Sequence, residues 1–159
     1  MFRQIIQSPV GDLAVVADDK ALLMLEFAGT GRERDFGVPS TTNPIIESIR
    51  GELRAYFDGD LKEFKTPIRL GGTPFQRAVW NELLKIPYGH TRSYIDIARI
   101  LGSELKTRAV GGANGRNCLA IIVPCHRVIN ADGKLGGYGG TLPVKKRLLD
   151  LESGTLRLL

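Results

Sequence analysis

The 159-residue sequence predicts an α+β fold made of two domains. Short β-prone runs separated by Gly and Asp turns fill its first part, and one helical pattern follows them. The second half contains a succession of helix start and stop signals instead. We therefore expect a small α/β domain over residues 1–65, a linker over 66–72 and a mainly helical domain over 73–159.

The first domain is predicted to contain three strands and one helix. β-branched and aliphatic runs place the strands at residues 2–7, 13–17 and 21–27. Apolar side chains then recur at helical spacing from Ile45 to Phe57, and Asp58-Gly59 ends the helix. No pattern in this domain suggests chemistry. Pro67 and Gly71-Gly72 mark the linker.

Capping residues define the helices of the second domain. Thr73-Pro74-Phe75-Gln76 predicts a helix start, with Thr as N-cap and Gln completing a capping box. Pro87-Tyr88-Gly89 ends that helix, and Ser93 can cap the next one. Gly102-Ser103 leads into a further helix over residues 104–114. Two short helices around a Gly-containing turn match a helix-turn-helix.

The last of these helices carries Gly111-Gly112 in its interior. Each Gly destabilises a helix by roughly 1 kcal/mol relative to Ala. Close approach of another helix and close approach of DNA explain the pair equally well. Residues 73–159 hold 13 Lys/Arg against 6 Asp/Glu, whereas residues 1–72 hold 9 against 11. This charge split, with Arg108 at the helix start, favours DNA.

Composition predicts a soluble, cytoplasmic protein, or a nuclear one in a eukaryote. Hydrophobic residues make up 43% and charged residues 25% of the chain. No apolar run approaches the ~20 residues that span a bilayer, and the N-terminus does not resemble a signal peptide. With only Cys118 and Cys125, and two histidines, we expect neither a disulfide nor a metal site, and no membrane partner.

The run Ile-Val-Pro-Cys-His-Arg-Val-Ile places Cys125 and His126 side by side. A thiol attacks as its thiolate, and a neighbouring imidazole or cation favours that form. Adjacent side chains on a strand point to opposite faces, so the pair needs a bend, which Pro124 favours, or a bridging water. A buried, inert thiol is the alternative. We expect residues 119–123 to enter this run as a buried strand or extended segment.

Together these motifs resemble the 6-O-alkylguanine-DNA alkyltransferases, also called methylated-DNA–protein-cysteine methyltransferases. The resemblance covers residues 73–153 nearly without gaps. Its motifs are Phe75-Gln76 with Val79-Trp80, Ile86-Pro87-Tyr88-Gly89, Ser93-Tyr94, the Arg108–Ala113 run, Asn117, Pro124-Cys125-His126-Arg127-Val128, Gly137-Tyr138, and Lys145 with Leu148-Leu149. It implies a ribonuclease-H-like α/β domain followed by a winged-helix-like domain with a helix-turn-helix.

The resemblance implies direct reversal of DNA damage. Cys125 would take the alkyl group from 6-O-alkylguanine, and from 4-O-methylthymine as a second substrate, in one irreversible step. Such a methylated-DNA–[protein]-cysteine S-methyltransferase reacts once and needs no cofactor. Its partner would be double-stranded DNA with alkylated bases, from which the base is flipped out. We expect a monomer in solution and leave open cooperative assembly on DNA.

Residue roles follow from the same resemblance. His126 would act as base through a water, Glu152 would orient His126, and Asn117 would brace the turns. Tyr94 would donate to the departing guanine and crowd the target phosphate, and Arg108 would fill the vacated stack. The guanine pocket would comprise Tyr138, the Gly139 N–H, the carbonyls of Cys125 and Val128, and Lys145. The small groove-facing residues would be Ala109, Gly111, Gly112 and Ala113.

Two departures from the family pattern stand out. The pocket loop reads Tyr138-Gly139-Gly140-Thr141, where Tyr-Ser-Gly-Gly or Tyr-Ala-Gly-Gly is usual, and Cys118, expected to pack in the core, replaces a common proline.

Two rival interpretations exist. A cysteine hydrolase would need a clear oxyanion loop and a redox thiol enzyme a resolving Cys-x-x-Cys motif, and this chain has neither. A non-catalytic lesion-binding relative would lack the reactive Cys, which is present as Cys125.

Overall fold

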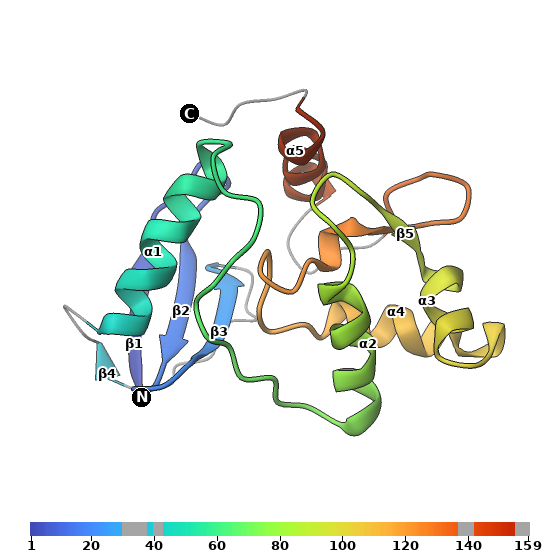
Figure 1. The fold of residues 1–159 in the computed structure, drawn as a ribbon, viewed down its shortest axis with the longest axis horizontal. Helices are drawn as coiled ribbons and strands as arrows, with labels where there is room; N and C mark the ends of the chain where they lie inside the picture. Colours follow the sequence, from blue (N-terminus) through green and yellow to red (C-terminus); the bar gives the residue numbers. More distant parts are fainter. Residues whose placement is uncertain (30–37, 40–42, 137–141, 155–159) are drawn as a thin grey trace.

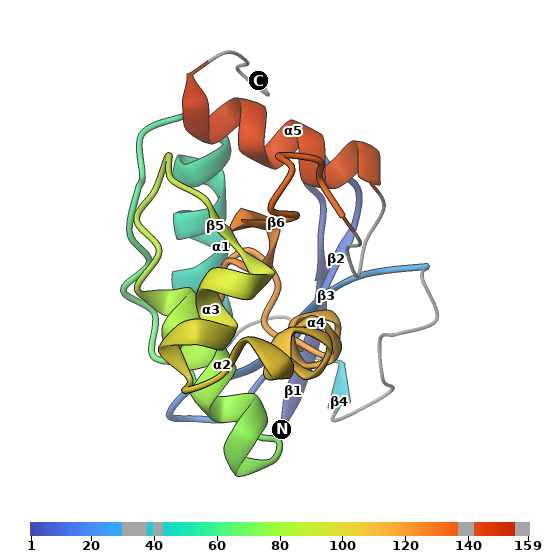
Figure 2. The same ribbon diagram turned by 90° about the vertical axis from the view of Figure 1, so that its right-hand side faces the viewer.

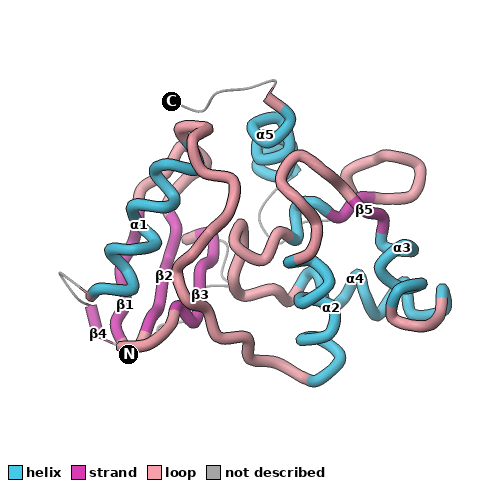
Figure 3. Tube along the Cα trace, in the orientation of Figure 1, coloured by secondary structure: helices cyan, strands magenta, loops and turns pink. Residues whose placement is uncertain are grey.

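A small sheet with one helix and a group of short helices lie side by side, with a last helix beside both (Figures 1 and 2). This computed structural model describes residues 1–29, 38–39, 43–136 and 142–154. Figure 3 colours its elements by type. They are β1 (Phe2–Ile6), β2 (Leu13–Ala17), β3 (Leu22–Phe27), β4 (Val38–Pro39), α1 (Pro44–Phe57), α2 (Pro74–Leu84), β5 (Arg92–Ser93), α3 (Tyr94–Ile100), the 3₁₀ helix η1 (Glu104–Lys106), α4 (Thr107–Gly115), the 3₁₀ helix η2 (Cys125–Arg127), β6 (Val128–Ile129) and α5 (Leu142–Ser153).

The N-terminal sheet has the strand order β3-β2-β1-β4. β1 and β3 pair antiparallel with β2, and β4 pairs parallel with β1. All five residues of β2 are buried, so both faces of this central strand are covered. Leu13 and Val15 belong to the main core, whereas Ala14 and Val16 form a second cluster against which Cys118 packs. Cys118, expected to pack in the core, is only half-buried and lies against this second cluster.

The predicted linker is held against the sheet. The Leu22 N–H donates to the Pro67 carbonyl (2.8 Å), and the Arg69 N–H donates to the Leu22 carbonyl (3.0 Å). Further along β3, Leu25 exchanges hydrogen bonds with Cys118 and Ala120. One apolar core contains residues from α1, the sheet, α2, α4 and α5. The two predicted domains therefore share an interior.

The helices of the second half begin where their caps predict. Thr73 and Gln76 form the capping box of α2, and Ser93 with Asp96 forms that of α3. The expected continuous helix over 104–114 is wrong in its first turn, which is the 3₁₀ helix η1 capped by Ser103. The Trp80 indole N–H donates to the Ala113 carbonyl (2.9 Å) and ties α2 to α4.

Residues 119–123 are buried, but they form turns rather than the expected strand or extended segment. Only Leu119 pairs, in an isolated parallel bridge with Leu25. The chain then turns, with the Val123 N–H donating to the Leu119 carbonyl (2.9 Å) and Ile121 at φ +72°. An apolar run alone does not separate a buried strand from a buried turn. In the described chain, the helices are too short or too polar to cross a membrane.

Candidate functional site

Cys125 lies at the start of η2, a single 3₁₀ turn that follows Pro124. Cys125 is 4% exposed to solvent, and His126 is fully buried. Asn117 holds the approach to this turn, because its Nδ2 donates to the Val123 carbonyl (2.7 Å) and its Oδ1 accepts from the Leu119 N–H (2.9 Å). The predicted bend after Pro124 is thus a 3₁₀ turn, and the bracing position predicted for Asn117 agrees with its contacts.

Glu152, near the end of α5, gathers the polar side chains of the site. Its Oε2 lies 2.6 Å from His126 Nε2 and accepts from the Tyr56 hydroxyl at 2.6 Å. Arg127 donates from Nε to Oε1 (2.7 Å) and from Nη2 to Oε2 (3.1 Å). A third Arg127 nitrogen, Nη1, donates to the Ile86 carbonyl (2.7 Å). The His126–Glu152 contact expected from the sequence is present, within a larger network.

Glu152 is ionised in this network although it is only 6% exposed. Burial by itself would raise its pKa. The charge of His126 and the hydrogen bonds from His126 and Arg127 outweigh burial and lower the pKa of Glu152 to about 2. An ionised carboxylate only accepts hydrogen bonds, so Nε2 of His126 carries a proton whether the ring is neutral or charged. The other ring nitrogen, Nδ1, has no hydrogen-bond partner among the described residues.

A short strand pair brings Tyr94 to the cysteine turn. β5 pairs parallel with β6, with Arg92 opposite Val128 and Ser93 opposite Ile129, so α3 starts beside the residues that follow η2. Burial and the charge of Cys125 raise the pKa of Tyr94, although an Asn114 hydrogen bond acts in the opposite direction. Tyr94 therefore keeps its proton at neutral pH and can donate a hydrogen bond.

Lys145 is a fully buried cation of α5. Its Nζ donates to the carbonyls of Val128 (2.6 Å) and Leu135, and lies 5.9 Å from the centre of the Tyr94 ring. Burial lowers the pKa of Lys145 to about 8, and negative charge on Cys125 acts in the opposite direction. The structure thus brings Lys145, Val128 and Tyr94 together, as predicted. Tyr138 and Gly139 lie outside the described residues.

The predicted groove-facing residues separate into two groups on α4. Arg108, Ala109 and Gly112 are exposed. Gly111 is half-buried, and a Cβ built on it would lie 4.0 Å from the ring of Tyr94. Ala113 is 4% exposed, and its carbonyl accepts from Trp80. Its expected place on the outer face is therefore wrong, because the side of α4 that carries Ala113 and Val110 packs into the core.

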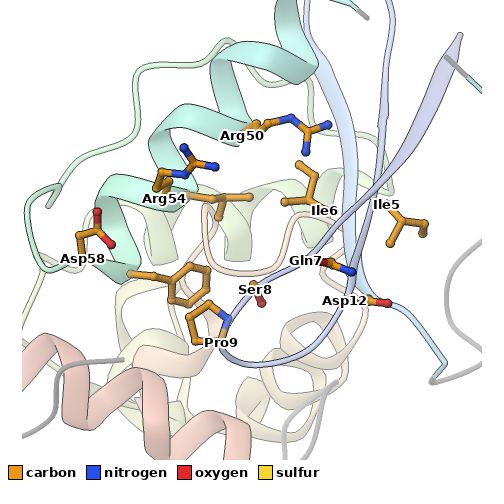
Figure 4. A pocket seen from close by; sticks show the side chains of 11 residues that line it. Ile5, Ile6, Gln7, Ser8, Pro9, Asp12, Arg50, Arg54 and Asp58 are labelled. Carbon is orange, nitrogen blue, oxygen red and sulfur yellow. The ribbon is translucent and has the colours of Figure 1, made fainter. Parts of the chain in front are cut away.

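Two cavities of the described residues lie apart from this site. One of about 600 Å³ lies between β1, the turn after it and α1, and is lined by Ile5, Pro9 and Arg50 among others (Figure 4). It contains two arginines and two aspartates, so its formal charges cancel. A second, of about 430 Å³, lies beside β5 and β6 and includes Ser93 and Asn130. Neither cavity includes Cys125 or Glu152, and we place the chemistry at Cys125.

Three residues of the network were absent from the sequence prediction. Tyr56 comes from the domain in which no chemistry was expected, Arg127 was quoted only as part of a motif, and Asn114 was treated as part of a small-residue helix. The Asn114 Nδ2 donates to the Cys125 carbonyl at 3.4 Å. The only available signal was the position of Arg127 next to His126, because the partners of Tyr56 and Asn114 are distant in sequence.

The fold and site define a protein with a buried thiol next to a His–Glu pair, in the half of the chain that also holds the short helices α3 and α4 joined through η1. Residues 74–154 match the family model described as 6-O-methylguanine DNA methyltransferase, DNA binding domain, and residues 1–70 match that of the ribonuclease-like domain of the same family. The chain therefore belongs to the 6-O-methylguanine DNA methyltransferase family. The predicted family is confirmed.

Relatives with this family name match over nearly their whole length. The methylated-DNA–protein-cysteine methyltransferase of Methanosarcina barkeri is 42% identical over 160 residues, covering 99% of this chain and 100% of that protein. The Mycobacterium tuberculosis protein of the same name is 47% identical over 152 residues, covering 92% and 89%. A crystal structure of Mycobacterium tuberculosis OGT in complex with DNA matches with a TM-score of 0.91 and 44% identity, covering 98% and 94%. The predicted α+β fold class is confirmed.

Proposed function

We propose that this protein repairs DNA by moving the alkyl group of 6-O-alkylguanine onto its own Cys125, in one irreversible step. The observation that carries the proposal is the buried Cys125–His126–Glu152 arrangement, in which an ionised carboxylate fixes one imidazole nitrogen and leaves the other available. Family membership supports it. The protein is its own alkyl acceptor, so it reacts once.

The proton balance follows from the tautomer of His126. Nε2 donates to Glu152, so Nδ1 is the lone pair that can take the thiol proton, directly or through one water. The S–C bond then forms while the bond between the alkyl carbon and the guanine oxygen breaks. The bonding electron pair goes to the guanine ring, which takes up a proton and leaves as unmodified guanine. Glu152 stabilises the imidazolium without accepting its proton.

Tyr94 and Lys145 support departure of the base. Negative charge develops on guanine as the carbon–oxygen bond breaks, and a protonated Tyr94 is a donor for it. Lys145 supplies a buried positive charge near Tyr94 and fixes the Val128 carbonyl, which has a second lone pair for the guanine amino group. Tyr138 and the Gly139 N–H complete this proposed pocket, on residues outside the described ranges.

The target carbon is inaccessible inside a duplex, so the base has to be flipped out, at a cost of a few kcal/mol. Arg108 is exposed at the start of α4 and is the candidate to occupy the vacated stack. Ala109, Gly111 and Gly112 leave room for close approach of a groove. Since damage occurs in any sequence, contacts with phosphates should dominate over base readout. A solution monomer and a cytoplasmic location stay predictions.

Intact mass spectrometry tests the proposal. The protein is incubated with duplex DNA containing 6-O-methylguanine, and we expect one added methyl group per molecule, located on Cys125. Cys125→Ser should gain none, whereas Cys118→Ser should react like the wild type. A folded protein that binds the duplex but gains no mass would support the lesion-binding alternative. Repeated turnover of an ester or disulfide substrate would support the thiol enzyme.

A further inference from the structure

The Tyr56 hydroxyl reaches the reactive site from the other half of the chain. Tyr56 lies in the last turn of α1, is fully buried, and donates to Glu152 Oε2 at 2.6 Å across 96 residues of sequence. The same oxygen atom lies 2.6 Å from His126 Nε2. A residue of the N-terminal half therefore contacts the carboxylate that orients the proposed base.

The donors around Glu152 leave its carboxylate little freedom. A carboxylate has about four acceptor positions, and four donor contacts converge on this one, from Tyr56, His126 and two nitrogens of Arg127. Rotation of the carboxylate would break several charge-assisted hydrogen bonds at once. Tyr56 and Arg127 together therefore determine where Oε2 meets His126.

The ring of Tyr56 is itself fixed by aromatic packing. Its centre lies 5.2 Å from that of Phe57 and 5.5 Å from that of Phe64. It meets the ring of Tyr88, from the second half, edge to face at 6.3 Å and 84°. The Arg127 guanidinium carbon lies 5.8 Å from the centre of the Tyr88 ring. These contacts join both halves of the chain around the hydroxyl of Tyr56.

We propose that Tyr56 is a positioning residue for alkyl transfer, which holds the Glu152 carboxylate in the orientation that His126 requires. The inference rests on the proposed function of Cys125, and it assigns to the N-terminal half a direct part in reactivity. A buried tyrosine hydroxyl needs a partner wherever it lies. What distinguishes Tyr56 is that its partner is the atom that also meets His126.

The test compares Tyr56→Phe with Tyr88→Phe in the full-length protein. In the described structure the Tyr88 hydroxyl donates weakly to the Leu151 carbonyl at 3.4 Å and not to Glu152, so its removal is the matched control. We expect Tyr56→Phe to slow single-turnover transfer from free 6-O-benzylguanine roughly tenfold, the size of one charge-assisted hydrogen bond. The Kd for undamaged duplex DNA should stay within about twofold, because the substitution removes one buried hydroxyl and leaves the exposed α4 residues Arg108, Ala109 and Gly112 unchanged. Tyr88→Phe should react at close to the wild-type rate.

An NMR signature separates positioning from a general loss of stability. The Nε2–H proton of His126 reports its hydrogen bond to Glu152, and we expect this resonance to shift or to exchange faster with water in Tyr56→Phe but not in Tyr88→Phe. An unchanged resonance together with an unchanged rate would overturn the inference. The resonance can be compared even if no alkyl group is transferred, so failure of the proposed function remains distinguishable from failure of this one.

A second substitution keeps the test valid if Tyr56→Phe does not fold. Replacing Tyr56 by 3-fluorotyrosine retains the ring and the hydroxyl but makes the hydroxyl more acidic. We expect the His126 Nε2–H resonance to move in this protein while the fluorescence of Trp80 stays that of the wild type. A resonance that does not move would overturn the inference for a folded protein.

Discussion

Glu152→Gln tests the buried contacts of the Glu152 carboxylate with His126 and Arg127. The substitution keeps the size of the side chain and removes its charge. Arg127 and His126 then lose their anionic partner, and the Arg127 guanidinium keeps the Ile86 carbonyl and the ring of Tyr88, neither of which carries a compensating charge. Breaking a buried ion pair by removing one partner leaves an uncompensated charge and is strongly destabilising.

The magnitude follows from the pKa of Glu152. A fall from the ordinary value of 4.5 to about 2 corresponds to about 3 kcal/mol in favour of the ionised form in the folded protein. Because the folded pKa lies below the unfolded one, this stabilisation is fully present above pH 4.5. It is lost as the pH falls towards 2. We expect Glu152→Gln to lower the free energy of unfolding by about 3 kcal/mol at pH 7 and by much less near pH 2.

Urea unfolding followed by tryptophan fluorescence measures this difference. Trp80 is the only tryptophan of the chain, and it is buried against α4. Glu104→Gln is the control, since Glu104 pairs with Arg99 on the surface, where both side chains are more than half exposed. This control should change the unfolding free energy by less than about 1 kcal/mol.

Subtracting the mutant from the wild type at each pH isolates Glu152 from the other carboxylates. A difference below about 1 kcal/mol at pH 7 would refute the reasoning, because the buried Arg127 charge would then be compensated in some other way. A difference that is equal at pH 7 and near pH 2 would also refute it, since the carboxylate would not be the titrating group.

Three further substitutions test the DNA face, the pocket and the turn. Arg108→Ala should weaken duplex binding and leave the reaction with free 6-O-benzylguanine intact. Binding assays and transfer rates check this, and equal losses in both would contradict it. Gly136→Ala should destabilise the protein by more than about 1 kcal/mol and slow transfer, because Gly136 has φ +69° and a Cβ would lie 3.2 Å from Tyr94. A melting temperature and a transfer rate equal to those of the wild type would contradict this. Asn117→Ala should lower the free energy of unfolding in urea by about 1–3 kcal/mol, since the Val123 carbonyl loses its donor. Unchanged DNA binding is the control, and an unchanged free energy of unfolding would contradict the bracing role.

Local signals predicted the parts of the fold that depend on nearest neighbours. The caps at Thr73 and Ser93 start α2 and α3 because a capping box involves residues only three positions apart. Residues 119–123 were predicted as a buried strand or extended segment, because their apolar character is compatible with several buried conformations. The turn at Ile121, with φ +72°, depends on Asn117 and on pairing with β3, which a local pattern does not contain.

The site was predictable to the extent that its residues are adjacent or carry a family motif. Cys125 and His126 are neighbours, and their chemistry follows from their side chains. Sequence physics alone did not select Glu152 among the six acidic residues of the second half, and the resemblance supplied it. Tyr56 had neither signal, because its contact with Glu152 exists only after the two halves pack on one core.

The buried charges of the site favour the thiolate of Cys125, which is the reactive form of the side chain. Burial disfavours a charged thiol, so a thiol this inaccessible needs compensation. Arg127 and Lys145 bring two buried cations against the single carboxylate of Glu152, and transfer of a proton from Cys125 to His126 leaves this balance unchanged. Lys145 is still mostly protonated at neutral pH, with a pKa of about 8, so Arg127, Lys145 and Glu152 together carry one positive charge in excess. That excess favours first the thiolate and then the negative charge that develops on the departing guanine, so the same buried cations serve both ends of the displacement.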